Sequence, residues 1–371
     1  MDKRPYQICS RCVMDTSDED IVFDENGVCH HCKDFEKILQ QPKFDKEFAE
    51  SKLNELVNRV KLKGKNNKYD CLVGISGGVD SCYTAYLCKK WGLRPLLLHM
   101  DNGWNSDISV SNVKKMVDKL QLDYVSYVLD WKEFREIQLA FLKSSIVDLE
   151  IPTDLAIPAS LYEVAAKNNI SFLISGGNYS SEGILPLTWG YHVLQDSHLY
   201  RQIVHKYSST KNKKVPYVGL WGEFYFKFIK GIKKLYPLNL VQYNKDEARE
   251  FLKKEFDWKD YGGKHHESKI TAFWQSYAMP TKYNMDYRRA TFSSQIVSGQ
   301  IKREEALRQL KELPYNPEKI EDDKSFIAKK YNISKDDLNM YLALPPKTYK
   351  DFPNQKKLIT FVYNVYRKLF N

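Results

Sequence analysis

Long apolar runs and the common nucleotide-binding patterns are both missing from this 371-residue sequence. No run of about eighteen apolar residues occurs, and the start, Met1 to Pro5, lacks the apolar core of a signal peptide. We therefore expect a soluble, cytoplasmic protein with no membrane span. Neither GxxxxGK[ST] nor GxGxxG occurs, which excludes a Walker-type phosphate loop and a dinucleotide fingerprint.

Cysteine is missing from everything after Cys88, and four of the 7 cysteines gather near the N-terminus as two CxxC pairs. In a reducing compartment this spacing is typical of a structural zinc ribbon, in which four thiolates close a tetrahedral site. The predicted zinc ligands are Cys9, Cys12, Cys29 and Cys32. A disulfide pair or a redox dithiol is the alternative.

The overall composition is that of an ordinary globular protein. With 43% hydrophobic and 13% aromatic residues, the chain can bury a substantial core and form two or three structural units. A net charge of +10 favours anionic partners: nucleotides, nucleotide-linked sugars, RNA or an anionic membrane surface. Charge alone does not choose among them.

The most informative segment is residues 76–81, which lies between an apolar run at 71–75 and a helical stretch at 82–91. A strand that feeds a helix leaves unpaired backbone N–H groups at the helix N-terminus, and these form an anion site. Adjacent glycines let a phosphate approach, serine hydroxyls donate to it, and an aspartate can carry magnesium. The predicted ATP-binding residues here are Ser76, Gly77, Gly78, Val79, Asp80 and Ser81. A Gly-Gly turn that merely joins strand to helix is the alternative.

Apolar and helical patterns alternate around this loop. The predicted buried parallel strands are 70–75, 94–100, 124–129 and 171–175, with helices between them at 83–91, 109–120 and 158–168. The fold class is therefore α/β, a doubly wound parallel sheet that binds ligands at the carboxyl ends of its strands. Met100 ends the second strand and would offer backbone groups to adenine. Gly176 and Asn178 belong to a second Gly-Gly turn at the same edge.

Composition shifts divide the chain into four parts. These are a zinc-ribbon-like module at 1–40, a helical connector at 41–68, a nucleotide-binding domain at 69–190 and a mostly helical substrate or partner region at 191–371. The module cannot fold on its core alone, so we expect a metal-stapled appendage. The basic aromatic stretch 224–234 predicts either a helix packed on the core or a membrane-facing surface.

Ionisable residues without metal-ligand spacing concentrate in three segments of the C-terminal region, 261–268, 287–290 and 298–306. Lys264, Arg288 and Arg289 can neutralise phosphates of ATP or of a nucleotide-linked substrate. His265 or Glu267 can assist proton transfer. The predicted catalytic residues are Asp80, Lys264 and His265, and the predicted substrate residues are Glu267, Arg288 and Arg289. A solvated charged surface is the alternative.

The sequence of residues 76–81, SGGVDS, resembles the SGGxDS loop of the N-type ATP pyrophosphatases, or PP-loop proteins, which are adenine nucleotide alpha hydrolase-like in fold. Over nearly its full length the chain is similar to bacterial N-acetyl sugar amidotransferases of surface-polysaccharide and flagellin-glycan biosynthesis. This resemblance rests on the cysteine module, the loop, and the segments 99–104, 175–178 and 263–268.

The resemblance implies an ATP- and magnesium-dependent ligase. In that family the acetamido carbonyl of a nucleotide-linked N-acetyl sugar is adenylated, and ammonia then displaces AMP to give an acetamidino group. A separate glutaminase subunit supplies the ammonia. The chain itself offers no ammonia source, since residue 2 is Asp2 and the segment 27–30 lacks the second glycine of a GxCxG elbow. We expect no nucleic-acid partner.

Two other functions stay open at this point. A tRNA thiolase can combine zinc knuckles with the same loop, but sulfur transfer needs a reactive thiolate near the nucleotide. Cys82 and Cys88 are instead predicted to pack behind the loop. A non-catalytic zinc-ribbon adaptor would bind ATP without producing AMP.

Overall fold

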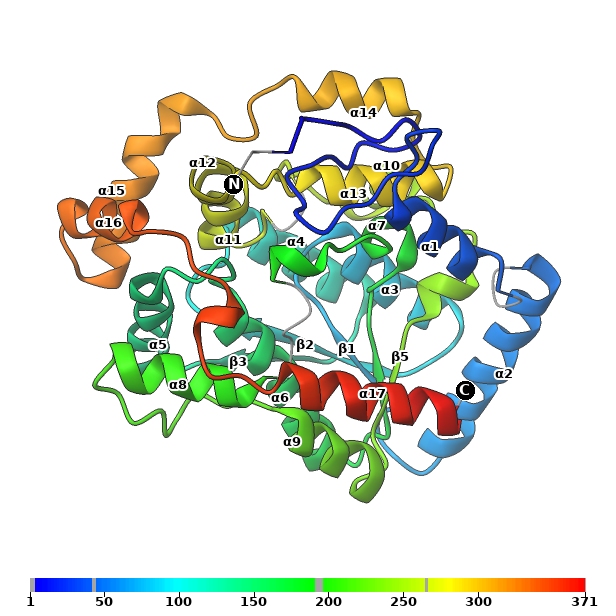
Figure 1. The fold of residues 1–371 in the computed structure, drawn as a ribbon. Helices are drawn as coiled ribbons and strands as arrows, with labels where there is room; N and C mark the ends of the chain where they lie inside the picture. The colour runs from blue at the N-terminus through cyan, green and yellow to red at the C-terminus, as the bar shows by residue number, and fades with distance from the viewer. Residues whose placement is uncertain (1–3, 42–44, 191–195, 264–265, 371) are drawn as a thin grey trace.

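A parallel five-stranded sheet lies at the centre of the computed structural model, which describes residues 4–41, 45–190, 196–263 and 266–370 (Figure 1). The strands are β1 Cys71–Gly74, β2 Pro95–Asp101, β3 Tyr124–Val128, β4 Phe172–Ile174 and β5 Lys233–Leu235. Their order across the sheet is β3-β2-β1-β4-β5, and every neighbouring pair is parallel. The predicted α/β class and the four predicted strands are confirmed.

The sheet differs from the prediction at its two edges. The fifth strand, β5, pairs with β4 and comes from beyond residue 190, so the predicted boundary there does not separate the sheet from the region that follows. Strand β3 was expected to be buried, but Tyr124 is 39% and Val128 67% exposed. As an edge strand, β3 is covered less completely than the strands at the centre of the sheet.

Helices make up most of the remaining structure. Their bounds are α1 His30–Leu39, α2 Lys46–Gly64, α3 Val79–Lys90, α4 Asp107–Leu120, α5 Trp131–Ser144, α6 Ile151–Lys167, α7 Tyr179–Glu182, α8 Ser197–Tyr207, α9 Leu220–Phe224, α10 Lys245–Phe256, α11 Lys269–Phe273, α12 Met279–Tyr283, α13 Arg288–Val297, α14 Arg303–Leu310, α15 Ile320–Tyr331, α16 Lys335–Ala343 and α17 Lys356–Phe370.

Alternation along the strands explains why helices cover both faces of the sheet. Neighbouring residues of a strand point to opposite faces. On β1, Val73 belongs to a core cluster with residues of α2, α3, α4 and α10, whereas Leu72 belongs to a cluster with residues of α6. Both faces are apolar and both are covered, as in a doubly wound sheet.

A further apolar cluster joins the C-terminal helices to the sheet domain. It combines Trp104, from the loop after β2, with residues of α5, α8, α11 and α15. The indole of Trp104 is 1% exposed and donates to Gln138 Oε1 at 2.5 Å. The C-terminal region is therefore packed against the carboxyl edge of the sheet.

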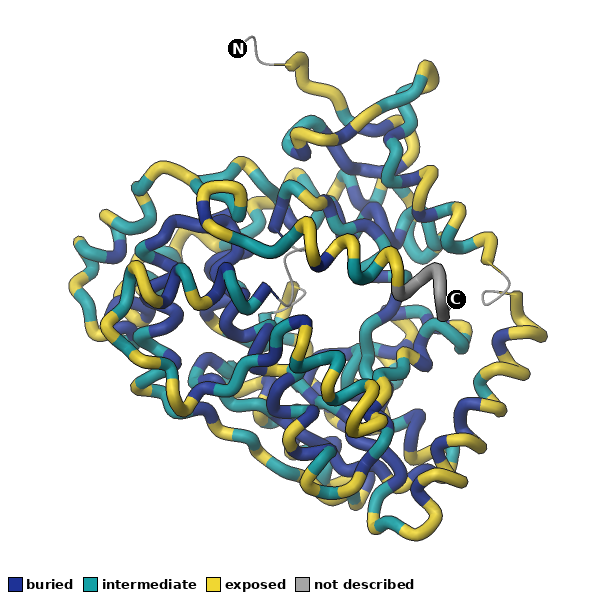
Figure 2. Tube along the Cα trace, turned by 60° about the horizontal axis from the view of Figure 1, so that its bottom comes forward, coloured by how far each residue is buried: buried dark blue, intermediate teal, exposed yellow. Residues whose placement is uncertain are grey.

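The N-terminal module is docked on the helices α13 and α14 (Figure 1). Arg303 of α14 donates to the carbonyls of Cys9 and Cys12 at 2.8 and 2.9 Å, and the Arg289 guanidinium lies 3.0 Å from an Asp15 carboxylate oxygen. Figure 2 shows buried residues within this peripheral segment. The module is thus an integrated part of the fold, whereas the sequence suggested an appendage.

The basic aromatic stretch is divided between core and surface. The helix α9 continues into a π-helical turn at Tyr225–Ile229. Phe226 stacks on Tyr162 with ring centroids 4.7 Å apart, but Phe228 and Ile229 are 47% and 74% exposed. Among the described helices, none combines the length and apolar content needed to cross a membrane.

Candidate nucleotide site and cysteine cluster

The loop between β1 and α3 is held in shape by its two serines. Ser81 Oγ accepts from the Ser76 backbone N–H at 3.1 Å and donates to the Gly78 carbonyl at 3.1 Å. Ser76 Oγ in turn accepts from the Gly78 N–H at 3.3 Å. These bonds fix the loop before any ligand arrives, which reduces the ordering cost of binding.

Helix α3 begins at this loop without a side-chain cap. Its N-cap is Gly78, which has no side chain, whereas Ser106 caps α4 and Asp130 caps α5 by accepting backbone N–H bonds. The first N–H groups of α3 therefore stay available, and the helix dipole makes them favourable for an anion.

Two glycines of the site are required by close backbone approach. Gly77 has φ +88, and a Cβ there would collide with the Ser109 carbonyl of α4. A Cβ on Gly176 would come within 2.7 Å of the Asp80 backbone carbonyl carbon. The two Gly-Gly turns identified in the sequence thus lie against each other at the carboxyl edge of the sheet.

Asp80 is the charged centre of the site. Its carboxylate accepts from Asn178 Nδ2 at 3.3 Å and from the Tyr243 hydroxyl, and it lies 3.6 Å from Lys245 Nζ. Burial and the Asp80 charge raise the pKa of Tyr243 well above its ordinary value, so the phenol stays a donor. The Asp80 side chain is 22% exposed and can hold a magnesium ion that accompanies a nucleotide.

The end of β2 adds a fixed polar group beside the loop. His99 is 5% exposed, its Nδ1–H donates to the Ile75 carbonyl at 2.8 Å, and its Nε2 accepts from Asn105 Nδ2 at 2.9 Å. These two partners fix the orientation of the imidazole ring. Met100 follows His99 on β2, where it pairs with Tyr127, and its contact with adenine stays a prediction.

Glu267 connects the C-terminal region with the loop. Its carbonyl accepts from the Ser106 N–H at 2.8 Å, and its side chain interacts with the Tyr261 hydroxyl. That hydroxyl would lie 2.7 Å from a Cβ built on Gly78. Glu267 is therefore near the nucleotide loop, as a substrate residue would have to be. Lys264 and His265 lie outside the described residues.

Arg288 and Arg289 lie elsewhere in the molecule. Arg288 pairs with Asp286 at 2.7 Å, and Arg289 bonds to the N-terminal module through Asp15 and the Val13 carbonyl. Both guanidinium groups thus have structural partners. The structure does not bring them to the loop together with Asp80, so their predicted contact with substrate gains no support.

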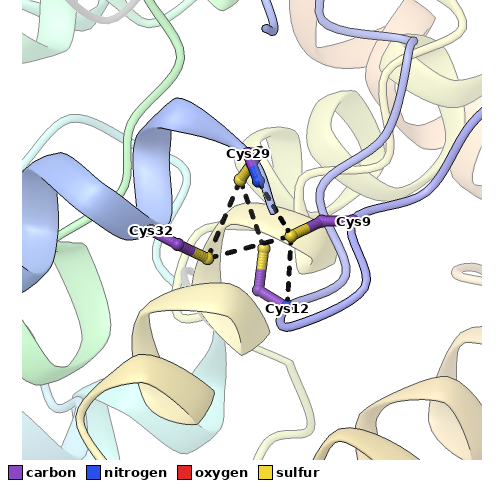
Figure 3. Close-up of side chains that lie close together, drawn as sticks. All are labelled: Cys9, Cys12, Cys29 and Cys32. Atoms are coloured by element: carbon purple, nitrogen blue, oxygen red, sulfur yellow. Dashed lines mark hydrogen bonds between the residues drawn. The ribbon is translucent and has the colours of Figure 1, made fainter. Parts of the chain in front are cut away.

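The four N-terminal cysteines converge on one point (Figure 3). Their ligand atoms all lie within 4.8 Å of one another, and neighbouring sulfurs are 3.7 to 3.9 Å apart. A tetrahedral zinc thiolate site, with Zn–S near 2.3 Å, separates its sulfurs by about 3.8 Å. All four side chains are 0% exposed, so the cluster can hold a metal ion and is closed to solvent.

Two family models match the chain. One, described as the LPS biosynthesis protein WbpG-like, C-terminal domain, matches residues 267–369, and the NAD synthase model matches residues 51–149. The chain combines a PP-loop domain of the NAD synthase type with a WbpG-like C-terminal domain. The relationship inferred from the loop and the C-terminal segments is confirmed, and the PP-loop domain is of a type found in ATP-using synthetases. None of the curated proteins matches the chain significantly.

Solved structures similar to this chain include an NH3-dependent NAD synthetase from Campylobacter jejuni, with 24% identity and TM-score 0.29. The match covers 39% of this chain and 63% of the synthetase, which is less than two thirds of its length. An NMN synthetase from Francisella tularensis has 17% identity, TM-score 0.30, and coverage of 61% and 92%. The U34-tRNA thiolase NcsA from Methanococcus maripaludis has 14% identity, TM-score 0.33, and coverage of 83% and 89%. The function proposed below does not rest on these values.

Sequence reasoning missed two residues of the PP-loop site, Tyr243 and Lys245. Both contact Asp80 across more than 160 positions of sequence, the tyrosine at a separation of 163. Lys245 starts helix α10 behind the Asn244 cap, a placement that looks like any surface helix in the sequence. Its 9% exposure was the missing signal, and only the fold reveals it.

Proposed function

We propose that this protein is the synthetase subunit of an ATP-dependent amidotransferase, which converts the acetamido group of a nucleotide-linked N-acetyl sugar into an acetamidino group for surface-glycan biosynthesis. The observation that carries the proposal is the joining of an NAD synthase-type PP-loop domain to a WbpG-like C-terminal domain in one chain. The first supplies ATP chemistry and the second supplies the link to polysaccharide biosynthesis.

The chemistry fits the geometry of the loop. The amide oxygen attacks the α-phosphorus, the bond to the β-phosphate oxygen breaks, and pyrophosphate leaves. The N–H groups at the start of α3 and the Ser76 hydroxyl would donate to the negative charge that develops on the leaving pyrophosphate, while Ser81 holds the loop in shape. Lys245 adds a buried positive charge beside them, and Asp80 would hold the magnesium.

The second step replaces AMP by nitrogen. Ammonia attacks the imidate carbon, the carbon–oxygen bond to AMP breaks, and the former amide oxygen leaves on AMP. We propose that a separate glutaminase subunit delivers the ammonia, because water would otherwise consume the activated intermediate. Lys264, His265 and Glu267 stay proposed participants in substrate binding and proton transfer.

We propose zinc for the cysteine cluster and a structural role for it. The cluster is closed, and its module is tied to α13 and α14 by Arg289 and Arg303. Four thiolate ligands leave no open position for a substrate.

The decisive test is mass spectrometry of nucleotide-linked N-acetyl sugars incubated with protein, ATP, magnesium and ammonium chloride. A product in which the carbonyl oxygen is replaced by an imino nitrogen, with equal amounts of AMP and pyrophosphate, supports the proposal. The isolated chain should use ammonium and not glutamine, and an added glutaminase subunit should restore the use of glutamine. Efficient glutamine use by the chain alone would refute the subunit arrangement.

The thiolase alternative is disfavoured by the three remaining cysteines. Cys71, Cys82 and Cys88 are each 0% exposed, and burial raises the pKa of Cys82 above its ordinary value. A buried neutral thiol is a poor carrier of sulfur. The adaptor alternative is separated by AMP formation, which an adaptor would not show.

A further inference from the structure

The segment between α5 and α6 buries two carboxylates, each with one oxygen that the described part of the protein leaves without a hydrogen-bond partner. Asp148 and Glu150 are each 8% exposed. Asp148 Oδ2 and Glu150 Oε1 have no hydrogen-bond partner among the described residues. Buried carboxylate oxygens are normally paired, because an unpaired one loses its hydration without compensation. Two such oxygens in one segment therefore point to a ligand that supplies the missing partner.

The topology places this segment at the edge of the sheet where the PP-loop lies. Helix α6 leads into β4, and a helix that connects parallel strands runs opposite to them, so its first turn lies at their carboxyl ends. Asp154 belongs to that first turn. The adjacent Thr153 accepts from Asn102, in the loop after β2, at 3.5 Å.

Two neighbouring residues connect the carboxylates with the nucleotide loop. The charge of Glu267 contributes to the raised pKa of Glu150, and the Glu267 side chain interacts with Tyr261 beside Gly78. The charge of Glu182 in α7, the helix that Asn178 caps, contributes to the raised pKa of Asp154. The carboxylates therefore lie close to residues that border the nucleotide loop, and Glu267 among these belongs to the segment that matches the WbpG-like domain.

The electrostatics of the group favour a cation. Burial raises the pKa of Asp148 to about 7 and that of Glu150 to about 7, and burial with the neighbouring carboxylates raises that of Asp154. No lysine or arginine is among the principal causes of these three pKa shifts. A cation placed among them would favour the ionised carboxylates and would itself be bound more tightly in this low-dielectric setting.

A single metal ion fits this group poorly. Among the described residues, the four cysteines form the one group of three or more His, Cys, Asp or Glu side chains placed so that they could hold a metal ion, and Asp148, Glu150 and Asp154 do not form such a group. An organic cation that presents N–H groups in several directions can reach carboxylates that are further apart.

We propose that Asp148, Glu150 and Asp154 bind the amidinium group that the reaction creates. This inference rests on the proposed function. The acetamido group of the substrate is neutral, whereas the acetamidino product is a cation that keeps its proton at neutral pH. The three carboxylates would therefore stabilise the positive charge that develops after nitrogen attack, and they would bind the uncharged substrate less well.

The test measures binding of acetamidinium chloride by isothermal titration calorimetry with the full chain at about pH 8, which is above the pKa of about 7 of Asp148 and Glu150. Wild type should show saturable binding, while neutral acetamide and choline chloride should not. Glu150→Gln and Asp148→Asn should each weaken binding by about tenfold, as expected for the loss of a charge-assisted hydrogen bond. Glu223→Gln is the matched control, because the Glu223 side chain is only 15% exposed and is already paired with Lys234 at 2.9 Å.

Absence of saturable acetamidinium binding by wild type overturns the inference, and so does equal affinity in wild type and both neutralised variants. Magnesium chloride that competes with acetamidinium for the same carboxylates would also overturn it in favour of a metal site. Thermal melts confirm folding of each variant. Since the titration needs no turnover, failure of substrate-dependent pyrophosphate release would refute the proposed function separately.

Discussion

The cysteine cluster and the nucleotide loop are both short segments built for a charged ligand, but they differ in closure. The four thiols are 0% exposed and their module is tied to α13 and α14. The loop instead leaves the N-terminus of α3 uncapped and keeps Asp80 22% exposed. A closed site can stabilise the fold, whereas an open site can exchange its ligand during turnover.

The acidic segment 148–154, which carries Asp148, Glu150 and Asp154, shares properties with both sites. Like the cysteines, Asp148 and Glu150 are buried, yet like the loop they leave polar atoms without partners. Burying unsatisfied charge lowers stability, and such sites occur where binding or catalysis needs them. The comparison therefore predicts that changes at the loop lower activity and that changes at the cysteines lower stability. Changes at the acidic segment should raise stability and weaken binding.

The largest effect is expected at the open site. Asp80→Ala should lower substrate-dependent pyrophosphate release by about 100-fold or more, because it removes the carboxylate that we propose as a magnesium ligand and that accepts from Asn178. The melting temperature should change little. Asp107→Ala is the matched control, since Asp107 is also a first-turn helix carboxylate but is exposed. Equal activity of Asp80→Ala and wild type would mean that the nucleotide binds elsewhere.

A steric change at the loop sharpens the same point. Gly78→Val should block phosphate approach and also push against the Tyr261 hydroxyl, which would lie 2.7 Å from the new Cβ. We expect a loss of ATP binding in a titration with a nonhydrolysable analogue, with the fold retained by circular dichroism. Undiminished nucleotide affinity would contradict the close approach of phosphate to this residue.

The next effect belongs to the closed site and should appear in stability. Elemental analysis should find about one zinc per chain, and Cys9→Ser or Cys32→Ser should lose the metal together with several kcal/mol of folding free energy. Cys88→Ser, a buried thiol outside the cluster, should keep its zinc. Single cluster variants that melt like wild type, or protein without zinc, would show that the cluster does not stabilise the fold.

Substitutions of Lys245 test whether the nucleotide loop depends on a residue that is distant from it in the sequence. Lys245→Met removes the charge 3.6 Å from the Asp80 carboxylate and should lower pyrophosphate release by about tenfold. Lys245→Arg should restore part of that loss, because the charge returns with a different shape. If the methionine variant turns over at the wild-type rate, Lys245 only packs against the loop.

The acidic segment gives a pH-dependent stability effect. The pKa values of Asp148 and Glu150, about 7 in the fold, exceed their ordinary values, so the folded state holds protons that the unfolded state releases. The penalty is absent below about pH 4, grows between about pH 4 and pH 7, and is fully present above that range. Asp148→Asn should therefore melt closest to wild type near pH 4 and higher than wild type near pH 8, by about 2 °C. A difference that does not change with pH would contradict buried titrating carboxylates.

The smallest effect is expected where the module meets the C-terminal helices. Arg303→Gln removes two charge-assisted bonds to the carbonyls of Cys9 and Cys12 and should destabilise the fold by about 1 kcal/mol. Zinc content should be unchanged, because no ligand is altered. Loss of zinc in this variant would show that docking and metal binding cannot be separated.

Local patterns were enough to predict much of this protein. Three features are local in sequence: the strand–loop–helix at 71–90, the two Gly-Gly turns and the two CxxC pairs. Their spacing and residue types are therefore enough to predict their geometry. Backbone N–H groups at a helix start point to an anion whatever the rest of the chain does. The α/β class followed for the same reason, from alternation of apolar runs and helices.

Contacts between distant segments decided the rest. Tyr243 and Lys245 meet Asp80 only because α10 packs on α3, and β5 joins the sheet only because residues 233–235 return to its edge beside β4. Arg289 looked like a phosphate ligand in the sequence, yet the fold pairs it with Asp15. A charged side chain has no intrinsic partner, so its role depends on which surface the chain brings to it, and that is set by the burial of apolar residues throughout the molecule.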